Sequence, residues 1–179
     1  MTDSLSRLWA LTNEELADGA SDWNTFFDPI GMILDGTLRR EEYFCTPKNS
    51  VTFARTGGDG VHYGLLDVGE GYNDKCPVVM TVPMSDTHNT VVGENLIHFL
   101  ALGCRQGFLS LDGLIHRRAR TISTLDSHAD NEYADTQEML LFEALTNEFN
   151  LSPWEDHAAR LDELAMTYFG LVDAKSFPD

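Results

Sequence analysis

Two apolar segments joined by a short turn constrain the fold of this chain more than any other feature. In Val61–Val68, successive side chains point to opposite faces of a strand, and both faces are largely apolar. Val78–Val82 is apolar on both faces in the same way, and the turn Gly69–Asp74 lies between the two segments. A connection this short joins antiparallel neighbours, because a parallel crossover needs about a dozen residues or more. We therefore expect a central β-hairpin in a mostly antiparallel sheet.

Further strands are predicted at Tyr43–Cys45 and Val51–Ala54, which are short runs of β-favouring residues. The segment Gly57–Gly60, with the sequence Gly-Gly-Asp-Gly, separates the second of these runs from the hairpin. A phosphate-binding loop would be followed by a helix, whereas here a strand follows. The glycines and Asp59 therefore indicate a tight turn with positive backbone φ angles.

Helices are predicted on both sides of the sheet segments. The first 35 residues have helical patterning, and Thr12–Glu15 fits a capping box. Asn95–Leu102 places its apolar side chains on one helical stripe, and Gly103 stands where a left-handed C-terminal cap is common. The expected fold is a single α+β domain over residues 1–179, in which N-terminal and C-terminal helices pack on the central sheet.

The part of the chain from about residue 124 is predicted to be helical and is strongly acidic. Helices are expected over Thr136–Glu148 and after a second capping box at Ser152–Glu155. The first of them places Leu141, Phe142, Leu145 and then Phe149 toward the core. Thr124 to Asp179 holds 13 acidic and two basic residues, so this part contributes −11 to the net charge of −17. Just before it lies one compact basic cluster, His116–Arg120. Such an acidic surface disfavours direct binding to nucleic acids or anionic membranes and favours a basic protein partner.

The composition indicates a folded protein of the cytoplasm. Hydrophobic residues make up 42% of the 179 residues, which suffices for a core without disulfides. No apolar run reaches the length of a membrane span, and the N-terminus has no signal-peptide pattern. The three cysteines (Cys45, Cys76 and Cys104) form no Cys-x-x-Cys motif and suit buried thiols in a reducing compartment. We expect no metal and no cofactor, because the cysteines and the six histidines show no paired ligand spacing.

The candidate binding residues are polar side chains of predicted loops and aromatic side chains. The polar loop Ser85–Thr90 follows a buried strand, and loops on rigid scaffolds often bind partners. Aromatic side chains are frequent anchors in interfaces, although each aromatic candidate here could equally belong to the core. An acidic loop around residue 130 resembles a calcium loop, but Asn131 and Gln137 replace the required Gly and Glu. The candidates are Asp86, His88, Tyr72, Trp154 and Glu132.

A small hydrolase is the alternative from another class. It would use His62 and His88 with either Asp59 or Cys104. On a central strand, however, a histidine such as His62 is more often a hydrogen-bonded core residue. Cys104 neighbours a basic residue but directly follows an apolar helix, where a buried and unreactive thiol is the common outcome. No hydrolase motif is present, so we expect no catalytic residues. A regulatory scaffold that binds peptides or other proteins remains a third possibility.

Three segments of the middle of the chain, within about residues 43–115, resemble the SUKH superfamily. They are Phe-Ala-Arg-Thr-Gly-Gly-Asp-Gly-Val-His-Tyr at 53–63, Pro-Val-Val-Met-Thr-Val-Pro-Met at 77–84 and Asn-Leu-Ile-His-Phe-Leu at 95–100. That superfamily includes fungal cell-wall assembly regulators and many bacterial immunity proteins. The resemblance implies an α+β fold and a non-catalytic role in binding and neutralising protein toxins, often nucleases. The sequence thus predicts an acidic immunity-type protein with a basic partner, of which a nuclease toxin is one example.

Overall fold

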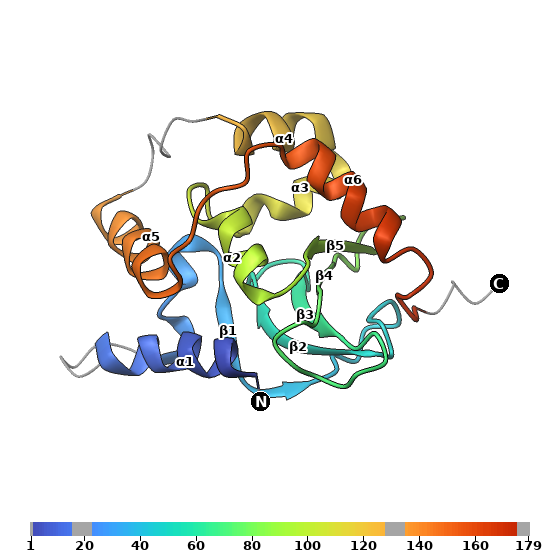
Figure 1. Cartoon of the computed structure of the whole chain (residues 1–179), viewed down its shortest axis with the longest axis horizontal. Helices are drawn as coiled ribbons and strands as arrows, with labels where there is room; N and C mark the ends of the chain where they lie inside the picture. Colours follow the sequence, from blue (N-terminus) through green and yellow to red (C-terminus); the bar gives the residue numbers. More distant parts are fainter. Residues whose placement is uncertain (1, 16–22, 128–134, 175–179) are drawn as a thin grey trace.

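The computed structural model describes residues 2–15, 23–127 and 135–174, and its centre is a five-stranded antiparallel sheet (Figure 1). Each strand pairs with the next one along the chain, so β1 and β5 form the edges. The predicted α+β class with an antiparallel sheet is confirmed. The strands are β1 (Ile33–Arg39), β2 (Ser50–Arg55), β3 (His62–Leu66), β4 (Val78–Thr81) and β5 (Asn89–Gly93).

The central hairpin forms as the sequence predicts. Every residue of β3 and β4 is buried, and the two strands pair from His62 opposite Thr81 to Leu65 opposite Val78. Because every residue is buried, both faces of these two strands are covered, and this agrees with the predicted central position in the sheet.

The Gly57–Gly60 turn between β2 and β3 also has the predicted conformation. Gly57 has φ 80°, Asp59 has φ 50° and Gly60 has φ 71°. Glycine reaches these angles without a steric penalty, and aspartate tolerates them better than most residues. The φ angles of this turn are therefore those that its local sequence predicts.

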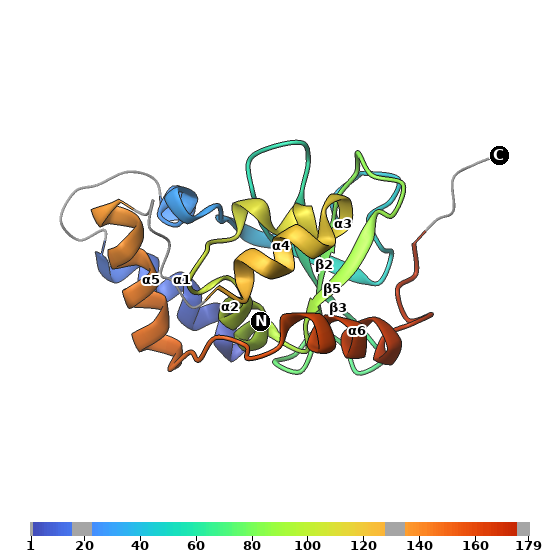
Figure 2. The same cartoon turned by 90° about the horizontal axis from the view of Figure 1, so that it is seen from above.

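Six α-helices and three short 3-10 helices accompany the sheet in the described residues. α2 follows β5 and packs back on it, α6 lies along β5, and α1 and α5 contact α2 (Figures 1 and 2). α3 contacts α4, and α4 contacts α6. The helices are α1 (Asp3–Glu15), η2 (Trp23–Thr25), η3 (Asp28–Ile30), α2 (Leu96–Gly103), η4 (Leu109–Asp112), α3 (Gly113–His116), α4 (Arg118–Leu125), α5 (Thr136–Phe149) and α6 (His157–Thr167).

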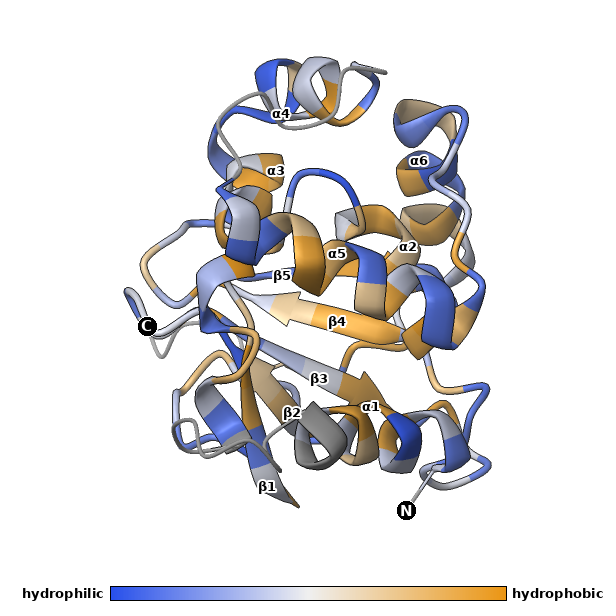
Figure 3. Cartoon of the chain, turned by 90° about the vertical axis from the view of Figure 1, so that its left-hand side faces the viewer, coloured by the Kyte–Doolittle hydropathy of each residue, from blue (hydrophilic) through white to orange (hydrophobic). Residues whose placement is uncertain are grey.

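The peripheral helices are amphipathic. α5 alternates hydrophobic and hydrophilic residues along its ribbon, while β4 is mostly hydrophobic (Figure 3). Leu141, Leu145 and Phe149 of α5 are buried at the spacing of one helical face, as predicted. No helix of the described residues has the length and apolar character that crossing a bilayer requires.

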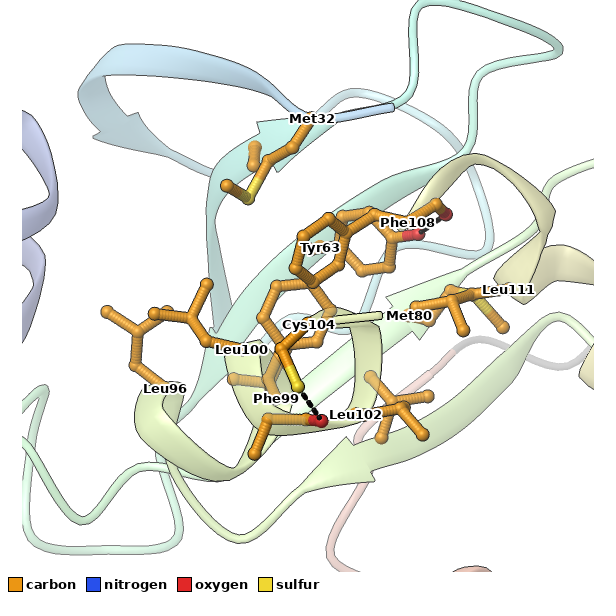
Figure 4. Close-up of a cluster of buried hydrophobic side chains, with 14 of the residues drawn as sticks. Met32, Tyr63, Met80, Leu96, Phe99, Leu100, Leu102, Cys104, Phe108 and Leu111 are labelled. Carbon is orange, nitrogen blue, oxygen red and sulfur yellow. Dashed lines mark hydrogen bonds between the residues drawn. The ribbon is translucent and has the colours of Figure 1, made fainter. Parts of the chain in front are cut away.

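An aromatic cluster lies between α2 and the sheet. The ring of Phe99 lies 4.7 Å from that of Tyr63, 5.0 Å from that of Phe108 and 5.8 Å from that of Phe53, and all four are fully buried. The Tyr63 hydroxyl donates a 2.7 Å hydrogen bond to the Phe108 carbonyl, so its polar end is satisfied (Figure 4). The predicted burial of the thiols also holds, since Cys45, Cys76 and Cys104 are all buried and free.

Two predictions of secondary structure were wrong. Residues up to 35 were expected to be helical, but Ile33 and Leu34 begin strand β1 and pair with Arg55 and Ala54. An edge strand with three of its seven residues exposed and no regular alternation lacks a clear strand pattern, and its ladder with β2 decides its conformation. Tyr43–Cys45 forms a turn instead of a strand, because its carbonyl groups bond to Thr46 and Asn89.

The predicted helix ends also differ from those observed. Thr12 lies inside α1 and donates to the Trp9 carbonyl, and Thr2 accepts from the Leu5 N–H near the start of that helix. α6 begins only at His157 and is capped by Asp156 instead of Ser152. Gly103 is the last residue of α2 and not a left-handed cap. A Cβ added to Gly103 would lie closer than 3.0 Å to the buried ring of Phe108. Close packing therefore explains this glycine.

Candidate functional site

The predicted binding loops lie at opposite ends of strand β4. Tyr72 is in the loop before β4 and is 40% exposed, whereas Asp86 and His88 are in the loop after it. Asp86 is exposed, but Ser85 is buried, and Asn89 and Thr90 belong to β5 instead of the loop. The fold therefore does not bring these three candidates together.

Trp154 is a buried residue and not an exposed anchor. It is 5% exposed, and its ring stacks at 5.8 Å on His157, which hydrogen-bonds Asp126 at 2.6 Å. Trp154 nevertheless lines a groove at the surface, beside α6. The fifth candidate, Glu132, lies outside the described residues.

This groove runs beside the first turns of α6 and has a volume of about 510 Å³. Most of its lining comes from α6 and the segment before it, and Glu94, which lies between β5 and α2, also lines the groove. α6 lies at the periphery of the fold (Figures 1 and 2). We call this feature the α6 groove, and its charged lining residues are Glu94, Glu155, Asp156, Glu163 and Arg160.

The single cation among the described residues of the α6 groove is already engaged within the chain. Arg160 places a guanidinium nitrogen 3.2 Å from Nδ1 of His98 and 3.8 Å from Glu94, and its guanidinium lies 4.7 Å from the centre of the Trp154 ring. Glu155 and Glu163 form no ion pair with any described residue. The groove therefore presents carboxylates whose charge is available to a cationic partner.

Sequence reasoning missed most of this groove. The acid excess after residue 124 points to Glu155 and Glu163, but it says nothing about Glu94, which precedes α2. Only the packing of α6 along β5 brings Glu94 to the groove. The spacing of Leu161 and Leu164, which are buried in α6, is a sequence signal from which the exposed position of Glu163 follows.

A second and smaller hollow, of about 180 Å³, lies at the end of the sheet near the Gly57–Gly60 turn. We call it the sheet-end cleft. Asp35 lies next to it, only 6% exposed, and its Oδ1 pairs with Arg55 at 2.8 Å. Burial raises the pKa of the Asp35 carboxyl, and the Arg55 charge counteracts that effect. The cleft is lined by Glu41, Tyr43, Arg55, Gly57, Gly58, Gly60, Val61 and His62.

His62 in this cleft has both ring nitrogens engaged. Nδ1 lies 2.8 Å from the Gly60 carbonyl, which can only accept, so Nδ1 carries the hydrogen. In the neutral ring, Nε2 then accepts from the Thr46 hydroxyl at 3.1 Å. The Tyr43 ring stacks on the imidazole at 5.6 Å. Burial lowers the pKa of His62, and this fits the prediction of a hydrogen-bonded core histidine.

The lowered pKa of His62 predicts a loss of stability in mild acid. The unfolded chain binds the proton more readily than the folded one, so the contribution of His62 to stability is present above its ordinary pKa of about 6.5. It is lost progressively as the pH falls from about 6.5 toward the lower pKa that His62 has in the folded state. The free energy of urea unfolding should therefore fall less between about pH 7.5 and about pH 5.5 in His62→Gln than in the unchanged chain. His116→Gln, an exposed control, should keep the original slope. Equal slopes in all three proteins would contradict this assignment.

Two residues of the hydrolase alternative, Cys104 and His62, are engaged in hydrogen bonds within the fold. The Cys104 thiol donates to the Ala101 carbonyl at 3.1 Å, and burial raises its pKa, although Arg105 acts in the opposite direction. A nucleophilic cysteine needs a lowered pKa. Both ring nitrogens of His62 are occupied by Thr46 and Gly60. No group of three histidine, cysteine, aspartate or glutamate side chains in the described ranges could hold a metal ion.

No protein-family model, curated protein or solved structure matches this chain. The hollows of the surface and the charge distribution are therefore the basis for a functional proposal.

Proposed function

We propose that this chain is a non-catalytic binding protein that holds a basic protein partner in the α6 groove. The observation that carries the proposal is a groove of about 510 Å³ in which four carboxylates face one arginine, and that arginine is already paired. Binding there would cover the positive surface of the partner and so neutralise it. This is the mode of action that the resemblance to SUKH immunity proteins implies.

The overall charge supports the same proposal. A chain with net charge −17 attracts a cationic partner over distances of about 8 Å at physiological ionic strength, which is the Debye length. Long-range attraction of this kind speeds the encounter, and the local carboxylates of the groove then set the orientation of the partner.

The test uses a charge-reversed groove. In Glu155→Lys/Glu163→Lys, neither change breaks an ion pair among the described residues, so folding should be retained. The intact chain, used as bait in its native cell, should retain a protein of basic isoelectric point. Calorimetry on the purified pair should show affinity about a hundredfold weaker for the double variant, at about tenfold for each reversed charge.

The matched control reverses two exposed carboxylates elsewhere, in Glu70→Lys/Glu143→Lys. This control carries the same net charge as the groove variant, so it separates the groove from the general acidity of the chain. It should slow association but keep the dissociation rate. Equal weakening by both double variants, or a partner whose association rate is insensitive to salt, would refute the proposal.

A further inference from the structure

A third hollow, between η4 and α4, differs in charge from the rest of the molecule. Its volume is about 170 Å³, and we call it the α4 hollow. No aspartate or glutamate of the described residues lines it, although the chain has 29 acidic and 12 basic residues. Its polar lining residues are Gln106, Ser110, Arg117, Arg120, Thr121 and Thr124.

The helical repeat of α4 brings three of these side chains to one face. Thr124 follows Arg120 by four residues and Thr121 by three, so the three lie along the same side of α4, and Arg117 directly precedes the helix. Gly113 lets this side approach η4 and α3 closely, because an added Cβ would lie closer than 3.0 Å to the Thr121 hydroxyl. The close packing of α4 at Gly113 therefore fixes the position of the helix side that lines the hollow.

The arginines of this segment divide into two kinds. Arg118 forms an ion pair with Asp162 of α6, so its charge is used within the fold. Arg117 and Arg120 are exposed, line the hollow and form no ion pair with a described residue. In a chain with a large surplus of carboxylates, two neighbouring guanidinium groups without a carboxylate partner among the described residues are a local reversal of charge.

Backbone donors add to the positive character of the hollow. Arg117 is the N-cap of α4, and no side chain within the described ranges caps the free N–H groups of the first turn. The positive end of the helix dipole therefore lies beside the two guanidinium groups. Ser110 and Thr121 add hydroxyl groups that can donate a hydrogen bond.

We propose that the α4 hollow binds a phosphate group, held by the guanidinium groups of Arg117 and Arg120. A guanidinium presents two parallel N–H donors that match the oxygens of a phosphate, and two of them can hold a tetrahedral dianion from two sides. The bound phosphate is either the free ion or a phosphomonoester. This site is separate from the α6 groove, and it does not depend on the protein partner proposed above.

The experiment titrates the full chain with inorganic phosphate and, separately, with glycerol 3-phosphate by calorimetry at constant ionic strength. Millimolar or tighter binding of either probe is expected, and the tighter of the two identifies the source of the phosphate group. Arg117→Gln and Arg120→Gln should each weaken binding about tenfold or more. Arg118→Gln removes the same charge from the same helix without touching the hollow, so it should keep the original affinity within about twofold.

Amide chemical shifts give a second readout that does not rely on the variants. Phosphate should shift the amide resonances of Thr121 and Ser110 more than those of the α6 groove. Absence of binding of both probes at millimolar concentration would overturn the proposal. Equal weakening in Arg118→Gln would also overturn it, because attraction to the general basic cluster would then explain the binding.

Discussion

Replacing Phe99 by alanine is expected to lower the free energy of unfolding by about 3–5 kcal/mol, measured by urea denaturation. Phe99 is fully buried, and its ring contacts the aromatic rings of Phe53, Tyr63 and Phe108. Figure 4 shows the last two of these contacts. The variant loses the transfer free energy of the ring and leaves a cavity that its neighbours fill only in part. Since small domains are stable by about 5–15 kcal/mol, this change threatens the folded state itself.

Phe169→Ala is the matched control for that experiment. Phe169 is 88% exposed, so the same change in chemistry there should alter stability by less than about 0.5 kcal/mol. A similar loss for Phe99→Ala and Phe169→Ala would contradict the assignment of Phe99 to the centre of the core.

Gly31→Ala is expected to destabilise the fold by about 3 kcal/mol or more, because two costs add. Gly31 has φ 81°, which strains any residue with a side chain, and an added Cβ would lie closer than 3.0 Å to the backbone of Leu109. The backbone cannot move away easily, since the neighbouring Ile30 carbonyl accepts a 2.8 Å hydrogen bond from the Phe108 N–H. Thermal and urea unfolding measure the loss.

Gly71→Ala separates the two costs. Gly71 has φ 71°, similar to that of Gly31, but no atom of the described residues lies within 4 Å of an added Cβ. This variant should lose only the conformational part, about 1–2 kcal/mol. If Gly31→Ala and Gly71→Ala lose the same amount, the contact between Gly31 and Leu109 does not constrain the fold.

The parts of the structure predicted correctly depend on neighbours in the chain. The turn at Asp59 follows from its flanking glycines, and β3 follows from an apolar run with turn residues at its end. The inward face of α5 follows from its helical repeat. In each case the determining residues lie within about ten positions of one another, where sequence periodicity reports directly on structure.

The parts that were missed depend on contacts between distant segments. β1 is strand because of its ladder with β2, although Ile33–Arg39 alone has a weak strand pattern. Tyr43–Cys45 is a turn and not a strand, and its contacts with distant segments include the Cys45 carbonyl on Asn89 and the Tyr43 ring on His62. Trp154 is buried because α6 packs against β5, and nothing near it in the chain distinguishes a buried tryptophan from an exposed one.

The amino-acid sequence alone thus determined the α+β class, the antiparallel hairpin and the excess of negative charge, since these follow from local periodicity and composition. Tertiary packing decided where the charges act. It brought Glu94 and Glu163 into the same groove, and it paired Arg118 with Asp162 while Arg117 and Arg120 both line the α4 hollow. The physical reason is that the interaction of charges depends on their distance in space, and the packing of distant helices sets that distance.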